Sequence, residues 1–188
     1  MTARIMSRAR GAAVAVVAML ALSACVFPGS GERPSGDSAR SLADVQNAIA
    51  AVPGVAGVHL GGGPDSIPGQ NEVNCSVVLA NGYSGDQTKL VDYLLRQLWS
   101  ENELKPTTTV SVDLAIGDPP TVPYPNLAAI ASDLGLTPDF GTGGMSVGHR
   151  DMEEHYGSWP GPVPTLPAEL AAVPTGSVNP SASSSPSP

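Results

Sequence analysis

The sequence has little cysteine, little aromatic content and little positive charge. Its 188 residues include 2 cysteines, and aromatic residues make up 4% of the chain. A small domain held together by disulfides needs several cysteines, so that class is excluded. Nine lysines and arginines stand against 17 acidic residues, for a formal net charge of −8. A nucleic-acid-binding protein needs a basic face that displaces counterions from phosphates, so nucleic acid is not an expected partner.

Long apolar runs are also missing, and the longest one is too short to span a membrane. It extends from Gly11 to Leu22 and follows Arg4, Arg8 and Arg10. Its length is about half the roughly 20 residues that a spanning helix needs. A short apolar run behind a positive segment is typical of a secretory signal peptide. The run leads into Leu22-Ser23-Ala24-Cys25, where two small residues precede a cysteine, the side chain whose thiolate is a strong nucleophile.

These four residues resemble the lipobox of bacterial lipoproteins, and the resemblance covers the first 25 residues. It implies that the signal peptide 1–24 is cleaved between Ala24 and Cys25. It also implies that Cys25 carries a thioether-linked diacylglycerol and that its new α-amino group can accept a further acyl chain. Two acyl chains give stable membrane attachment, whereas one gives only marginal binding. Two alternatives remain open, an ordinary secretory signal with an incidental cysteine and an uncleaved membrane anchor.

The implied location is the outer side of the cytoplasmic membrane, with the protein held there by its lipid. The Ala-, Gly- and Pro-rich composition points to a high-GC bacterium, so we expect a lipoprotein of an actinobacterial cell envelope. Residues 25–40 are rich in Gly, Pro and Ser and predict a flexible tether. Residues 160–188 contain eight prolines and predict a disordered tail, with at most one helical turn near 168–173.

Residues 41–159 carry the hydrophobic patterning of a single domain. Apolar spacing predicts helices over 41–52, 84–99 and 126–134, with Ser41 as the cap of the first and a Ser84–Gln87 capping box on the second. Alternation predicts strands over 55–60, 73–79 and 107–116, and a short edge strand over 145–148. The third helix should end at Gly135, with Leu136 as the apolar contact after it.

The order helix–strand–strand–helix–strand predicts an α+β fold. Two amphipathic helices are expected to cover one face of a small, mainly antiparallel sheet, while the other face meets water or the third helix. At the level of topology this order resembles the BON domain, a small cell-envelope module, and ferredoxin-like halves. No motif residues accompany that resemblance.

The residue types that carry catalysis are present without the spacing that catalysis needs. Cys75 falls in phase with the apolar residues of its strand, which predicts a buried structural thiol. The Gly61-Gly62-Gly63 and Gly141–Gly144 stretches lack the lysine of a phosphate-binding loop and are interpreted as turns. Ser84 lacks the following glycine of a nucleophile elbow. His59 is expected to be a structural histidine whose hydrogen bonds are satisfied.

The segment from His149 to His155 is the most polar in the domain. His149, Asp151 and His155 are the candidate metal ligands, because imidazole and carboxylate groups bind divalent cations. The six-residue spacing of the two histidines fits neither a helical i,i+4 pair nor a His-Glu-x-x-His motif. The segment is therefore interpreted as a solvated turn, and no metal or other cofactor is expected beyond the lipid on Cys25.

The expected function is non-enzymatic. The sequence predicts a membrane-anchored extracytoplasmic lipoprotein that displays a small acidic binding or accessory domain. Its expected partners are the membrane, through the lipid, and an envelope protein or wall component. The alternative is a carrier of a small ligand or metal that uses the segment from His149 to His155. A hydrolase without a familiar motif is the third class considered, and it would need a base beside a nucleophile.

Overall fold

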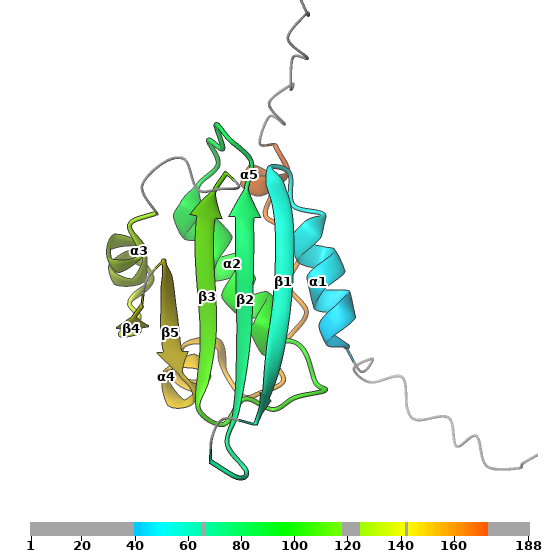
Figure 1. Cartoon of the computed structure of the whole chain (residues 1–188), viewed down its shortest axis with the longest axis vertical. Helices are drawn as coiled ribbons and strands as arrows, with labels where there is room; N and C mark the ends of the chain where they lie inside the picture. Colours follow the sequence, from blue (N-terminus) through cyan, green and yellow to red (C-terminus); the bar gives the residue numbers. More distant parts are fainter. Residues whose placement is uncertain (1–39, 65–66, 118–124, 142, 173–188) are drawn as a thin grey trace, which may run out of the picture. The chain divides into compact units, whose positions relative to one another are not determined.

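The structure is a computed structural model that describes residues 40–64, 67–117, 125–141 and 143–172. All of these belong to one unit of the chain, Asp37–Pro188. The predicted signal peptide, the lipobox with Cys25 and nearly all of the tether lie outside the described residues. The described elements, shown in Figure 1, are α1 (Leu42–Ala50), β1 (Val55–Pro64), β2 (Asn71–Leu79), α2 (Gln87–Trp99), β3 (Thr109–Ile116), α3 (Leu127–Leu134), β4 (Asp139–Phe140), β5 (Gly144–Gly148), α4 (His149–Tyr156) and α5 (Ala168–Ala171).

The strands form one five-stranded sheet in the order β1-β2-β3-β5-β4. Three of the four described pairings are antiparallel, and β2 pairs with β3 in parallel. Helix α2 connects these two parallel strands, which a tight turn cannot join. The α+β class and the mainly antiparallel sheet are therefore confirmed. The strand predicted over 145–148 is present as β5, but it is not the edge of the sheet, because the two residues of β4 pair with its outer side.

Local side-chain caps fix where the helices begin and end. Ser41 caps α1 as predicted, since its Oγ accepts the Asp44 N–H at 3.0 Å and the Asp44 carboxylate accepts the Ser41 N–H at 3.0 Å. The prediction that Ser84 caps α2 is wrong. The cap is Asp86, whose Oδ1 accepts the Lys89 N–H at 3.0 Å. Asp86 immediately precedes the first helical residue and so lies within reach of the free N–H groups of the first turn.

Helix α3 ends as its sequence predicts. Gly135 has a φ of 69°, a left-handed conformation that side chains with a Cβ rarely adopt. The Leu136 N–H then donates to the Ala131 carbonyl at 2.9 Å, which satisfies a carbonyl at the helix end. Helix α3 packs against α2 at the side of the sheet.

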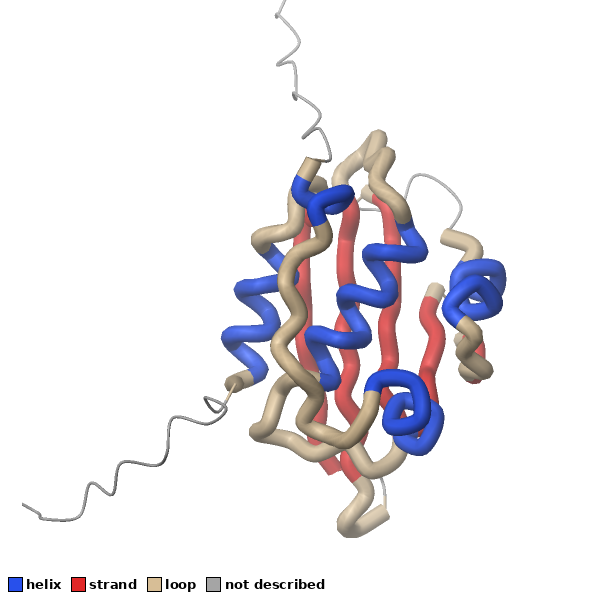
Figure 2. The backbone as a smooth tube through the Cα atoms, turned by 180° about the vertical axis from the view of Figure 1, so that it is seen from behind, coloured by secondary structure: helices blue, strands red, loops and turns tan. Residues whose placement is uncertain are grey.

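The core lies between the sheet and one helical layer. Figure 2 shows α1, α2 and α4 across the same side of the sheet, and their contacts with β1, β2, β3 and β5 agree. Cys75 lies in this core with no exposed surface, as predicted. The fully or nearly fully buried strand residues that face the helices are Val73, Cys75, Val77, Leu79, Val110, Val112, Leu114, Met145 and Val147.

Two predictions about β1 are wrong. Gly61-Gly62-Gly63 is part of the strand and not a turn, because all three glycines pair in register with β2. A Cβ at Gly61 would lie 2.7 Å from the Asn74 side-chain oxygen, so glycine there lets a neighbouring side chain lie across the strand. His59, which was expected to be a structural histidine, is exposed, because it lies on the side of the sheet that faces away from the helices.

The segment from His149 to Tyr156 forms helix α4, so the prediction of a solvated turn is wrong. Its single fully buried side chain, Met152, reaches the core, while most of the charged residues remain exposed. One apolar anchor in eight residues is too weak a periodic signal to distinguish a helix from a loop.

Residues 157–172, here called the C-terminal strap, pack against the helical layer. Figure 2 shows the strap running from α4 to α5 along the gap between α1 and α2 in that view. The Gly161 N–H donates to the Trp99 carbonyl at 2.9 Å, and Lys89 forms an ion pair with Glu169. Leu170 is fully buried in the core. The domain therefore extends through residue 172, and the prediction of disorder from residue 160 is wrong for 160–172; residues 173–188 lie outside the described residues.

We predict that Leu170→Ala destabilises the protein by roughly 2–5 kcal/mol, because it removes a fully buried side chain and leaves a cavity. Chemical denaturation followed by circular dichroism measures this loss. Val163→Ala is the matched control, since Val163 lies on the same strap with 59% of its surface exposed and should change stability by less than about 0.5 kcal/mol. An unchanged unfolding midpoint for Leu170→Ala would mean that the strap does not share in the cooperative fold.

Candidate functional site

The structure separates the three candidate metal ligands of α4. The His149 ring packs against Trp99 with 5.4 Å between ring centroids, and its Nε2 lies 3.8 Å from Glu153 Oε2. Asp151 and His155, one turn apart, instead line a pocket at the other side of the helix. Among the described residues, no three His, Cys, Asp or Glu side chains are grouped so that they could hold a metal ion.

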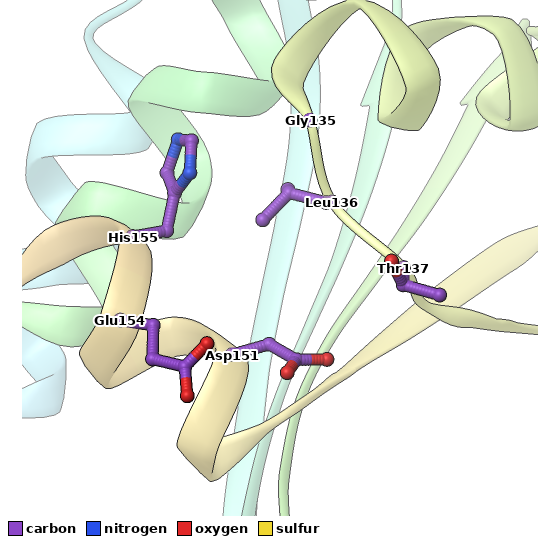
Figure 3. A pocket seen from close by; sticks show the side chains of 6 residues that line it. All are labelled: Gly135, Leu136, Thr137, Asp151, Glu154 and His155. Atoms are coloured by element: carbon purple, nitrogen blue, oxygen red, sulfur yellow. The ribbon is translucent and has the colours of Figure 1, made fainter.

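That pocket lies between α4 and the end of α3 and has a volume of about 280 Å³. It is open and mainly polar, with Asp151, Glu154 and His155 on one wall and residues 135–137 on the other. In Figure 3 the Glu154 carboxylate and the His155 imidazole point in different directions. The arrangement offers separate hydrogen-bonding groups to a small polar molecule, without a convergent set of ligands.

Two side chains of chemical interest are buried in structural roles. Burial, and secondarily the charge of Asp113, raises the pKa of the Cys75 thiol to about 12, so the reactive thiolate is scarce at neutral pH. Burial also raises the pKa of Glu101, which the sequence gave no reason to place inside the protein. Glu101 Oε2 accepts the N–H groups of Glu103 and Leu104 at 2.8 and 3.0 Å, so it holds the loop that leads into β3.

The side of the sheet away from the helices carries a second group of polar residues. No described helix lies in front of the strands in the view of Figure 1. The strand registers align these residues in two rows across the sheet. We call the nine residues the open face: His59, Ser76, Asp113 and Gly144 in one row, and Gly61, Asn74, Ser111, Ser146 and Asp139 in the other.

Hydrogen bonds between strands join four side chains of the open face in two pairs. Ser76 Oγ donates to Asp113 Oδ2 at 3.1 Å, and the hydroxyl groups of Ser111 and Ser146 are 2.7 Å apart. The Asp113 carboxylate lies over Gly144, where a Cβ would overlap it. Four polar side chains of the open face are therefore oriented by hydrogen bonds or by contact with a neighbouring strand.

His59, Ser76 and Asp113 lie next to one another in register on three strands, but they do not form a catalytic triad. In a triad the histidine lies between the other two and takes the proton of the serine hydroxyl. Here the serine lies between the histidine and the aspartate, and its hydroxyl donates to the aspartate. The arrangement therefore orients a carboxylate and does not activate a nucleophile.

Part of this site can be inferred from the alternation of apolar and polar residues along each strand. Ser76, Ser111 and Asp113 alternate with the apolar residues of β2 and β3, so the alternation places them away from the core, and the structure confirms this. The parallel pairing of β2 with β3, which brings Ser76 to Asp113, depends on contacts between strands far apart in the chain. No local signal in the sequence carries that register.

Comparisons of the chain with protein families, with curated proteins and with solved structures found no match in any of the three. The topology-level resemblance to the BON domain and to ferredoxin-like halves stays a prediction. In the part of the chain that the structure describes, none of the helices has both the length and the apolar character needed to cross a bilayer.

We predict that Cys75 in the native protein resists alkylation by iodoacetamide at about pH 8.5, where an unperturbed thiol is half ionised. Its pKa of about 12 and its burial both suppress reaction. Peptide mass spectrometry measures the labelled fraction of this cysteine alone, and the same reaction in guanidinium is the positive control. Rapid labelling of the folded chain would show that the thiol is accessible.

Proposed function

We propose that this chain is a membrane-anchored extracytoplasmic lipoprotein whose α+β domain binds an envelope protein or wall component through the open face. One observation supports the binding role above all. One side of the sheet is packed by helices, whereas the other side presents ordered hydrogen-bonding side chains that no described element covers. Such a surface is typical of a docking platform, since polar contacts fix the orientation of a partner.

The proposed anchor rests on the sequence. Leu22-Ser23-Ala24-Cys25 places a cysteine after small residues at the end of a short apolar run. Cleavage between Ala24 and Cys25 and transfer of diacylglycerol to Cys25 would hold the protein at the outer side of the cytoplasmic membrane. The net charge of −8 supports a domain that stands away from anionic lipid headgroups.

The proposal that the protein is not an enzyme rests on the geometry of the reactive groups. The sole described cysteine is buried with a raised pKa. Ser76, which lies between His59 and Asp113 in register, donates a hydrogen bond to the aspartate. Neither group has the adjacent base that nucleophilic catalysis requires.

We predict that Cys25→Ala abolishes lipid attachment and shifts the full-length chain from the membrane fraction to the soluble fraction. Incorporation of labelled palmitate and the intact mass of the purified protein measure the two effects. Cys75→Ala is the matched control, because it removes the other cysteine and should leave lipid attachment unchanged. A native mass that retains residues 1–24 and lacks a lipid would overturn the anchoring proposal.

A small-ligand or metal carrier is the second candidate, favoured by the pocket that Asp151, Glu154 and His155 share. The divergent side chains argue against tight metal binding. We predict that Zn²⁺ and Cu²⁺ leave the Tm of the protein unchanged in calorimetry. A bound metal at about 100 times its dissociation constant would add about 2.7 kcal/mol of stability. A saturable rise in Tm that His155→Ala removes would support the carrier instead.

A further inference from the structure

Strand β1 forms one edge of the sheet, and none of the described strands pairs with its outer side. It has ten residues, whereas β4 at the other edge has two. Natural proteins usually protect a long edge strand with a bulge, a proline or a lysine. The bulge between Val55 and Gly57 lies at the start of β1, and Pro64 lies at its end. The stretch Val58–Gly63 between them has no proline, lysine, arginine, aspartate or glutamate, so the middle of the edge is unprotected.

The backbone groups of alternate residues of β1 point away from the sheet. In β2 the Leu79 carbonyl accepts the Gly117 N–H at 2.9 Å, so every second residue back from Leu79 points its backbone groups toward β3. The residues between them point toward β1 and pair with it. The residues of β1 that are left with outward N–H and C=O groups are Val58, Leu60 and Gly62. No hydrogen bond among the described residues uses these outward groups.

An apolar strip follows the same edge on the side of the sheet that the helices cover. Val58 and Leu60 are half-buried and pack against the core. Leu104 is also half-buried and lies over Gly62, where a Cβ would be 2.7 Å from its Cδ2. A strand added to β1 would cover the exposed part of these three side chains. The edge therefore offers both free backbone groups and apolar surface to the same occupant.

We propose that an extended segment of a partner protein binds to the outer side of β1 as an added strand. Its backbone pairs with the outward N–H and C=O groups, whose alternation another extended backbone matches. Its side chains toward the helices are apolar, because they meet Val58, Leu60 and Leu104, and its other side chains are polar. The inference goes beyond the proposed function, because it uses the backbone at a sheet edge and not the side chains of the open face.

Helix α1 argues against a second copy of the chain as the occupant. It packs against β1, and Figures 1 and 2 both show it beyond the outer side of that strand. Edge strands of two copies related by a twofold axis pair in antiparallel fashion, which places both helical layers on the same side of the joined sheet. Two α1 helices would then lie over strands about 4.8 Å apart, whereas packed helices need about 8–10 Å between their axes. A single extended segment brings no helix with it.

Fluorescence anisotropy of the full-length chain in detergent, with a short labelled peptide of alternating valine and threonine, tests the proposal. The matched controls are two versions of this peptide, one with N-methyl groups on the valine amides and one with them on the threonine amides. In an added strand only one of these two sets of amides faces β1. We expect saturable binding of the parent peptide, loss of binding for one methylated version, and binding within about twofold of the parent for the other.

Val58→Lys should weaken binding of the parent peptide by about tenfold, because a lysine on an edge strand disfavours the addition of another strand. Val163→Lys is the matched control, since Val163 is exposed on the C-terminal strap, and it should leave binding unaltered. The Tm of each variant shows whether it is folded.

Hydrogen exchange of the unaltered protein tests the edge without a substitution. The outward amides of Val58, Leu60 and Gly62 should exchange rapidly in the free chain and at least about tenfold more slowly with saturating peptide. The amides of His59 and Gly61 face β2 and should be protected in both states.

Five outcomes would overturn the proposal. Absence of binding by the parent peptide would exclude an added strand, and equal effects of the two methylated versions would mean that the peptide does not bind as one. Slow exchange of the Leu60 amide in the free chain would mean that the edge is already covered. Self-association in sedimentation that Val58→Lys abolishes would assign the edge to a second copy, and binding of soluble peptidoglycan fragments that Val58→Lys abolishes would assign it to a wall component. The proposed binding role of the open face depends on other residues and survives each of these results.

Discussion

The fold depends on burial of only one side of the sheet. Along β2 and β3 every second side chain is apolar and enters the core, while most of the alternate positions, such as Ser76 and Asp113, are polar. This alternation forces the helices to one side, because the apolar row must be covered, and it leaves no driving force for covering the other. The open face is thus a direct consequence of the pattern that builds the core.

Both ends of the described part of the chain contact the helical layer. Gln97 of α2 is almost fully buried, and its side-chain oxygen accepts a hydrogen bond from Arg40, where the described chain begins. Its amide nitrogen lies 3.5 Å from the Pro164 carbonyl of the C-terminal strap. The Gln97 side chain therefore contacts both Arg40 and the C-terminal strap. Buried polar groups are costly unless they are paired, so these contacts favour one arrangement of the layer.

Sequence reasoning succeeded where the determining interactions are local. The Ser41 cap, the left-handed Gly135 and the alternation around Cys75 each depend on residues within a few positions of one another, and all three predictions are confirmed. The C-terminal strap was missed because its proline content is typical of disorder, while its order depends on distant contacts such as that of Gly161 with Trp99. Helix α4 was missed for the related reason that Met152 is its only fully buried side chain, which gives little periodic signal.

The same reasoning found half of the candidate site. Alternation indicates which side chains leave the core, but it does not indicate which strand lies next to which. Ser76 and Asp113 are 37 positions apart, and Asp113 meets Gly144 only because β5 returns antiparallel to β3. A site made from single residues of several strands therefore becomes visible only when the sheet is assembled.

The residues that stabilise the fold and the residues proposed to bind a partner lie on opposite sides of the sheet. The side chains of the open face contribute little apolar burial, because serine, glycine and aspartate have little apolar surface to remove from water. Stability rests on the other side, where α1, α2 and the strap cover the apolar row. Substitutions on the open face can therefore change the chemistry of docking while the core stays intact. For a domain proposed to be held at a membrane by a separate lipid, anchoring, folding and partner recognition would each depend on different residues.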